Sequence, residues 1–116
     1  MKSFRSEVKV KRWDLTTFGE ILVDLLPDGF DESGHPRMTV NAGGAPANVA
    51  AVAAARLGVK SAFIGKAGND AFGLYLKKTL ERCGVAVHGL VFDDTLPTTV
   101  AAVALSDDGE RSFSFY

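Results

Sequence analysis

The sequence predicts an α/β fold, and three observations support that prediction. Extended apolar segments alternate with helical segments over residues 42–92, a spacing typical of βαβ units, right-handed crossovers and a parallel sheet. Two more extended runs flank turn residues near the end of the sequence, which predicts a β-hairpin. The 116 residues have an ordinary globular composition, 47% hydrophobic and 23% charged, so a single domain is expected.

The first expected elements are strands. Residues 1–12 form a basic lead-in without the apolar run of a secretory signal. Residues 15–26 are apolar with Gly19 in the middle, which predicts a strand, a kink and a second strand. Residues 27–36 are rich in Pro, Gly and Asp and predict a loop, whereas residues 37–41 alternate and predict a short strand.

The first predicted helix follows the stretch NAGGAPAN, Asn41 to Asn48, and is rich in alanine. Pro46 suits its first turn, because the missing N–H would have no partner there, and Gly58 suits the position just past its end. Offsets of 0, 3, 4 and 8 predict that one face of this helix is buried. The members of that face would be Val49, Val52, Ala53 and Leu57.

The second half repeats the alternation. A compact strand is expected from Lys60, and a second helix with Asn69 or Asp70 as its N-cap and Gly84 just past its end. Another strand is predicted over residues 85–92. The final hairpin is apolar on both faces, so we expect one face to cover a site and the other to pack against something else. Its alternating sets are Val100, Ala102 and Ala104, and Ala101, Val103 and Leu105.

Several function classes find no support. The formal net charge of −1 gives no electrostatic argument for a nucleic-acid or membrane partner. Cys83 is the single cysteine and is interpreted as structural, and no Cys/His spacing suggests a metal site. No apolar run approaches membrane-spanning length, so a cytoplasmic location is expected. Neither the dinucleotide fingerprint nor the P-loop pattern is present.

The glycine stretch and Asp24 are the candidate site residues. Gly43 and Gly44 precede a helix N-terminus, where free N–H groups favour polar oxygens and where missing Cβ atoms let a ligand reach the backbone. Asn48 offers a donor and an acceptor. Asp24, in the apolar context ILVDLLP, is able to accept two hydroxyl hydrogen bonds. This set suits a polyol; the alternatives are a plain strand-to-helix turn and an aspartate on an edge strand facing solvent.

Five segments in this order resemble the N-terminal part of the ribokinase-like, phosphofructokinase B type carbohydrate kinases, with fructokinases the closest likeness. They are FGEILVDLLP, NAGGAPANVA, RLG, FIGKAGNDAFG and DDGERSFSFY. The resemblance covers residues 15–116 and implies an αβα sandwich with a small β-sheet lid. Residues 15–26, 37–41 and 98–116 would supply lid strands, and residues 42–92 the βαβ core.

The resemblance also implies an activity: phosphorylation of a sugar hydroxyl, with fructose favoured, using ATP and Mg²⁺. Asp24, Gly43, Gly44 and Asn48 match the family's sugar-binding residues, and Ala101 and Phe115 fall at ligand-facing lid positions. The lid is a dimer surface in many relatives, so a homodimer is expected. Ribose, nucleosides and 2-keto-3-deoxygluconate use the same scaffold.

Two departures from the family pattern generate expectations. The family's catalytic aspartate, anion hole and nucleotide site belong to a Gly-Ala-Gly-Asp-type segment that these 116 residues lack. We therefore expect an N-terminal part of a kinase that holds no catalytic or nucleotide-binding residue and is inactive alone. Gly58 also lies one residue later after Asn48 than is usual. We expect the last helical turn to widen near Ala53 to Arg56 while Leu57 stays buried.

Two other readings compete with the kinase. One is a non-catalytic module that binds sugar or dimerises through the lid. The other is a dinucleotide-binding oxidoreductase, which the missing fingerprint disfavours. A Gly-Ala-Gly-Asp motif in frame beyond Tyr116 would decide for the kinase.

Overall fold

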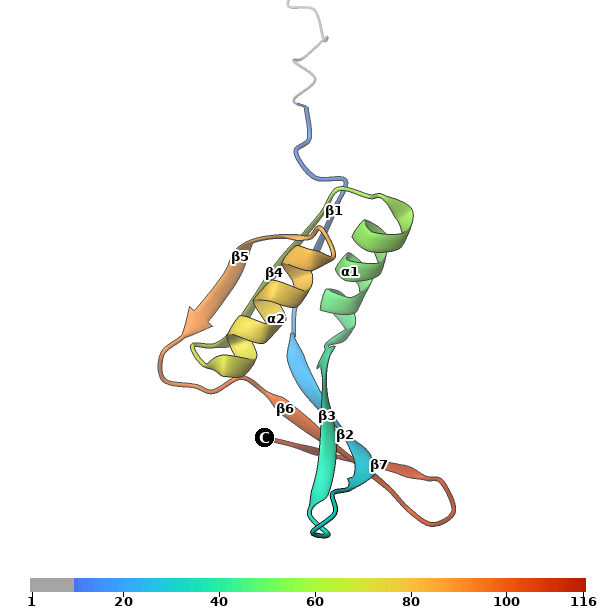
Figure 1. Ribbon diagram of the computed structural model, residues 1–116. Helices are drawn as coiled ribbons and strands as arrows, with labels where there is room; N and C mark the ends of the chain where they lie inside the picture. The colour runs from blue at the N-terminus through green and yellow to red at the C-terminus, as the bar shows by residue number, and fades with distance from the viewer. Residues whose placement is uncertain (1–9) are drawn as a thin grey trace, which may run out of the picture.

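The computed structural model describes residues 10–116, which form two β-sheets and two helices (Figure 1). Most of the predicted lead-in, residues 1–9, lies outside the described residues. The elements are β1 (Leu15–Phe18), β2 (Leu22–Phe30), β3 (Pro36–Gly43), α1 (Ala45–Leu57), β4 (Ser61–Gly68), α2 (Ala71–Arg82), β5 (Ala86–Asp93), β6 (Val100–Leu105) and β7 (Arg111–Phe115).

The first sheet has the order β1-β4-β5, and both of its pairings are parallel, as expected for βαβ units. Both helices contribute to a single hydrophobic core with β4 and β5 (Figure 1). Its buried members include Ala47, Ala50, Phe63, Leu76, Leu80 and Leu90. Phe18 on β1, Ile64 on β4 and Val91 on β5 remain exposed, so the helices cover only one face of this sheet.

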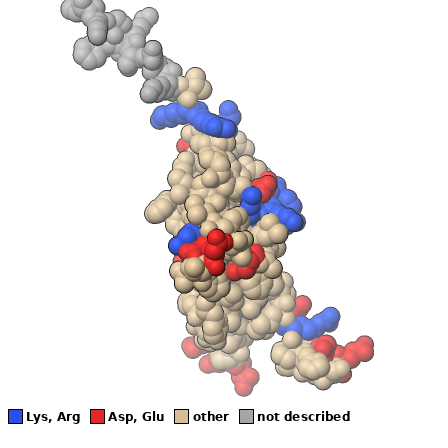
Figure 2. Space-filling view, turned by 90° about the vertical axis from the view of Figure 1, so that its left-hand side faces the viewer, with Lys and Arg blue, Asp and Glu red and all other residues tan. Residues whose placement is uncertain are grey.

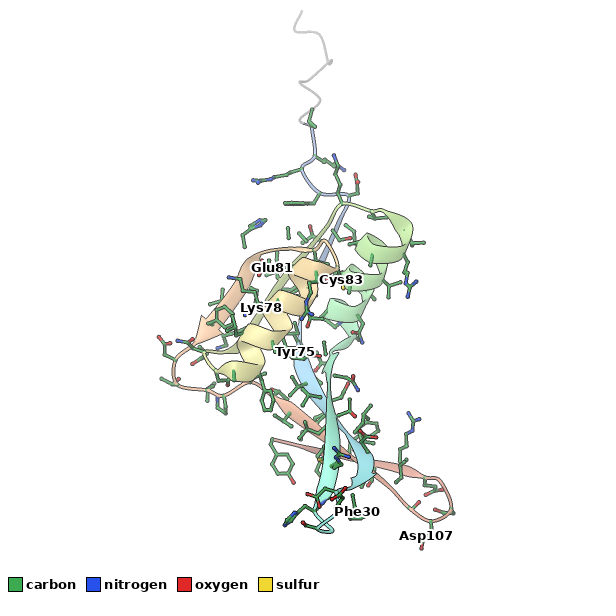
Figure 3. The ribbon with its side chains drawn as sticks, viewed as in Figure 1. Phe30, Tyr75, Lys78, Glu81, Cys83 and Asp107 are labelled. Carbon is green, nitrogen blue, oxygen red and sulfur yellow. The ribbon has the colours of Figure 1, made fainter. Side chains whose placement is uncertain are left out.

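The second sheet, which we call the lid sheet, has the order β3-β2-β6-β7 and extends beyond the end of the parallel sheet (Figure 1). β2 pairs with β3 antiparallel and with β6 parallel, and β6 and β7 form the predicted hairpin. In Figure 3, Phe30 and Asp107 mark the tips of its two hairpins.

Two boundary predictions need correction. Residues 15–26 do not all belong to the lid sheet, because Leu15–Phe18 pairs with β4 and only the part from Leu22 pairs with β3 and β6. The positive φ of Gly19, 147°, marks the change of direction between them. Only the middle of the loop predicted over residues 27–36 is a loop, because β2 runs to Phe30 and β3 begins at Pro36. The pairing of these two strands shifts register between Pro27 and Phe30.

The predicted buried face of α1 is wrong apart from Ala53. Ala47, Ala50 and Ala53 are buried, whereas Val49, Val52 and Leu57 are 53%, 55% and 72% exposed. Small side chains allow the helix backbone to lie close to the sheet. Leu57 therefore does not stay buried. The last turn does widen: Gly58 N–H, five residues on, and Val59 N–H, six residues on, both donate to the Ala53 carbonyl.

The second helix follows its prediction. Asp70 is the N-cap of α2 and accepts a hydrogen bond from Gly73 N–H at 2.8 Å. Leu76 and Leu80 face the core, and Cys83, a free and half-buried thiol, follows the helix. Among residues 10–116, neither helix is long and apolar enough to span a bilayer.

Candidate functional site

The residue register of the lid sheet places three predicted site residues in one row. Asp24 on β2 is opposite Ala101 on β6, and Ala101 is opposite Phe115 on β7. Because side chains of directly opposed residues point to the same face of a sheet, the three lie side by side. The row continues on the other side of Asp24 to Asn41 of β3. Asn41 was not predicted as a site residue, although it begins the glycine stretch.

Asp24 does not sit on an edge strand. β2 lies between β3 and β6, and the Asp24 side chain is half-buried. Among residues 10–116, its carboxylate has neither an ion-pair partner nor a hydrogen-bond partner. Its oxygen atoms are therefore free to accept hydrogen bonds from hydroxyl groups.

Gly43 leaves the space that the Asp24 carboxylate occupies. It is buried on β3, two residues after Asn41, and therefore on the same face of the sheet as the row. A Cβ added to Gly43 would overlap Asp24 Oδ2 and lie 2.9 Å from Leu22 Cδ1. Any larger residue here would move the carboxylate.

Gly44 makes the turn from β3 into α1 and serves as its N-cap. Its φ of 101° is a conformation that residues with a side chain rarely adopt, and a Cβ would lie 2.5 Å from the Glu20 carbonyl oxygen. No side chain caps the helix and no acidic residue lies in its first turn, where Pro46 is found as predicted. The positive end of the helix dipole at this turn is thus left without a negative side chain.

Asn48 is placed apart from the row. Its N–H donates to the Gly44 carbonyl at 2.9 Å, so it lies in the first turn of α1, as predicted. The residue is exposed and borders a hollow of about 630 Å³ whose other walls are apolar. Those walls include Leu15, Val49, Val52 and Leu57. Within residues 10–116, no hydrogen bond joins the Asn48 side chain to Asp24.

The face that bears Asp24 becomes apolar toward β7. Ala101 is 1% exposed and Val103 is 5% exposed, whereas Phe115 is 67% exposed. Phe115 stacks on Phe113, two residues before it, with ring centroids 6.3 Å apart. One end of the row is therefore polar and the other is aromatic.

Several other polar side chains have local partners. Lys66 Nζ lies 2.8 Å from Asp93 Oδ2. This contact, with hydrogen bonds from Leu96 and Thr95, lowers the pKa of Asp93. His35 Nδ1 lies 3.0 Å from Asp31, and the His88 ring packs on Trp13. Figure 2 shows small groups of acidic and basic residues, separated by uncharged surface, on the side that it displays.

No metal site is formed by this part of the protein. Among residues 10–116, no three His, Cys, Asp or Glu side chains gather in a way that would hold a metal ion. We therefore derive no step through a metal from these residues.

Comparison with known proteins identifies related sequences and structures. The model of the pfkB family carbohydrate kinases matches residues 14–116. Fructokinase-2 of Solanum lycopersicum is 46% identical over 104 residues, which are 88% of this chain and 31% of the relative. The chain thus spans about a third of the length of the curated relatives that it matches.

Solved structures agree with the architecture. A fructokinase from Xylella fastidiosa superposes with a TM-score of 0.80 at 45% identity, covering 88% of this chain and 31% of that one. A fructokinase from Vibrio cholerae O395, whose structure contains fructose, ADP and calcium, gives a TM-score of 0.70 at 44% identity, covering 87% and 31%. The predicted ribokinase-like fold, with a parallel sheet and a small β-sheet, is confirmed.

Proposed function

This chain belongs to the pfkB family of carbohydrate kinases, and from that premise we propose that it is the sugar-binding N-terminal part of a kinase that phosphorylates fructose. The observation that supports this most directly is the row from Asp24 through Ala101 to Phe115. In the proposal, adjacent sugar hydroxyls donate to the two Asp24 oxygens. Asn41 and Asn48 supply further polar contacts.

In the proposal, the apolar end of the row contacts the apolar part of the sugar. Phe115 lies against the C–H groups of the sugar, and the buried Ala101 beside Asp24 helps to keep water from the carboxylate. Gly43 and Gly44 let the sugar approach the backbone at the start of α1, where the helix dipole favours its oxygens. Hydrogen bonds in a dry pocket are stronger than in water, so this arrangement favours binding of a polyol.

The proposed reaction transfers the γ-phosphoryl group of ATP to one fructose hydroxyl and yields a fructose phosphate and ADP. The hydroxyl proton goes to a base, which the family resemblance places in a Gly-Ala-Gly-Asp-type segment that residues 10–116 do not contain. The contribution of this chain is to hold and orient the hydroxyl, which makes the attack effectively unimolecular. Mg²⁺, when bound with ATP, neutralises phosphate charge.

The assembly and location are part of the same proposal. We place the complete protein in the cytoplasm as a homodimer whose subunits meet at the lid sheet. Exposed apolar side chains on the face of that sheet opposite Asp24 support a contact there, and they include Met38 and Val40. The alternative is a chain that binds sugar or dimerises without catalysis. This alternative is compatible with the comparison, because the chain spans only about a third of the length of its relatives.

One experiment separates the two. The complete coding sequence that contains this chain is expressed, purified, and assayed for ADP release with fructose, ribose and no sugar. The kinase proposal expects ATP turnover that depends on fructose and a product that is a fructose phosphate. Fructose binding without turnover by the complete protein would favour the non-catalytic alternative.

A further inference from the structure

The segment between β5 and β6 takes the chain from the parallel sheet into the lid sheet, and two carboxylates hold it. Asp93 Oδ1 accepts hydrogen bonds from Thr95 N–H at 2.8 Å and from Leu96 N–H at 2.9 Å. Its other oxygen pairs with Lys66. The end of the segment, at Thr98, is held by Asp70.

The contact between Asp70 and Thr98 joins α2 to the lid sheet. Asp70 Oδ2 accepts Thr98 N–H at 2.8 Å, and Asp70 Oδ1 accepts the Thr98 hydroxyl at 2.7 Å. Asp70 Oδ1 also caps α2 through Gly73 N–H. One carboxylate therefore holds both the first turn of a core helix and the residue that leads into β6.

The Thr98 hydroxyl both donates and accepts a hydrogen bond in this contact. Its Oγ1 also accepts Gly68 N–H at 3.0 Å, so it touches the end of β4 as well as α2. Thr98 is 3% exposed. A Cβ added to Gly68 would overlap Thr98 N, which shows how closely the two segments approach. Buried donors whose hydrogen bonds are all made in one geometry favour that arrangement of the two segments.

A short path leads from Thr98 to the row of the candidate site. The Thr99 carbonyl accepts Val23 N–H at 3.0 Å, one residue before Asp24. Val100 and Tyr116 exchange two backbone hydrogen bonds at 2.7 and 2.8 Å, one residue from Ala101 and Phe115. A shift of Thr98 would therefore move β6 and β7, the strands that carry Ala101 and Phe115.

We infer that Asp70 is a positioning residue for the sugar site: by holding Thr98, it fixes the lid sheet against the core so that Ala101 and Phe115 stay beside Asp24. The inference rests on the proposed function for its effect on sugar binding. Its mechanical part, that the Asp70–Thr98 contact fixes the lid sheet, depends on these hydrogen bonds alone.

The test compares three single variants of the complete protein that contains this chain. Thr98→Val keeps the shape and removes the hydroxyl; Thr98→Ser keeps the hydroxyl; Thr99→Val makes the same change at the adjacent exposed position. Fructose KM, ATP KM and hydrogen–deuterium exchange of residues 100–116 are measured for each. For Thr98→Val we expect a fructose KM raised at least fivefold, an ATP KM within twofold, and exchange in residues 100–116 at least tenfold faster.

Thr98→Ser and Thr99→Val should match the unmodified protein. A merely destabilising change would lower the active fraction and leave the fructose KM in place. Unchanged exchange of residues 100–116 in Thr98→Val, or a Thr98→Ser variant that behaves like Thr98→Val, would overturn the inference. If Thr98→Val does not fold, Asp70→Asn serves instead, since it keeps the cap but has no second acceptor for Thr98 N–H.

The two proposals fail in distinguishable ways. An unmodified protein that does not phosphorylate fructose contradicts the proposed function, and the exchange measurement then decides the positioning role alone. Faster exchange with an unchanged fructose KM, in a protein that does phosphorylate fructose, would contradict the link between the Asp70–Thr98 contact and the sugar site.

Discussion

Asp24 and Ala101 lie directly opposite each other on the parallel strands β2 and β6. Neighbouring strands are about 4.8 Å apart, so a half-buried carboxylate stands beside a methyl group that is 1% exposed. The antiparallel partner of Ala101, Phe115, extends the row. A polar acceptor and an apolar wall are thus fixed at short range by backbone pairing, with no need for a flexible loop to bring them together.

Replacing Asp24 by alanine should weaken sugar binding selectively. Each charge-assisted hydrogen bond to the carboxylate is worth about 1.5–3 kcal/mol, so in the complete kinase the fructose KM should rise tenfold or more. The ATP KM should change little. Steady-state kinetics with each substrate varied in turn measure both constants.

Asp28→Ala is the matched control, because Asp28 lies four residues further along β2 at an exposed position. Its kinetic constants should stay within twofold of the unmodified protein. Equal increases in the fructose KM and the ATP KM of Asp24→Ala would contradict a sugar-specific role for this carboxylate.

Residues 1–116 alone should show no ATP-dependent phosphorylation of fructose or ribose. General-base catalysis contributes about 10²–10⁴-fold, and the family resemblance places that base outside these residues. A coupled assay of ADP release measures the activity, with a mock purification from the same host as control. Turnover above the mock sample that stays with the chain through two chromatographic steps would refute the prediction.

Ionised Asp70 should stabilise the folded protein, and this stabilisation should be lost at acidic pH. Burial alone would raise its pKa, but hydrogen bonds from Thr98 and Gly73 outweigh burial and lower the pKa below the ordinary 3.8. The folded state therefore prefers the ionised form, and the stabilisation is complete above pH 3.8 and is lost as the pH falls through the folded-state pKa. Thermal midpoints of the complete protein and of Asp70→Asn should differ most above pH 3.8 and converge as the pH falls through the folded-state pKa of Asp70.

The control for this titration is Asp107→Asn, at the exposed tip of the β6–β7 hairpin (Figure 3). Its midpoint should follow that of the unmodified protein at every pH. A difference between Asp70→Asn and the unmodified protein that persists undiminished to pH 2 would show that the Asp70 charge is not the cause.

The sequence predicts the strands and helices of this fold well where residue types contrast. Asp70 is identified as an N-cap because a short polar side chain precedes an amphipathic helix, and the hairpin after Thr98 is identified by its turn residues. The parallel pairing of β2 with β6 could not be predicted. It joins residues more than seventy positions apart, and no local pattern encodes such a pairing.

The alanine helix shows why its buried face was predicted wrongly. Hydrophobic periodicity identifies a buried face only where the hydrophobicity of neighbouring residues differs. It differs little in a run of alanines, so the prediction assigned the larger Val49, Val52 and Leu57 to the core. The structure buries Ala47, Ala50 and Ala53 instead. The prediction of the site is limited in the same way. Asp24 and the glycines could be identified from their residue types in the sequence, whereas Asn41 belongs to the site only because the strand register places it opposite Asp24.

The two adjacent glycines should respond differently to alanine. Gly43→Ala puts a methyl group where Asp24 Oδ2 lies, in a backbone conformation without positive φ, so it should displace the carboxylate and raise the fructose KM at least tenfold. Gly44→Ala instead meets a φ of 101° and the Glu20 carbonyl at 2.5 Å, which should cost about 1–3 kcal/mol of folding stability. Each variant of the complete protein is the control for the other, by fructose kinetics and by chemical denaturation. A folded Gly43→Ala variant whose fructose KM stays within twofold would contradict the prediction that the Asp24 carboxylate needs the space beside Gly43 in order to bind the sugar.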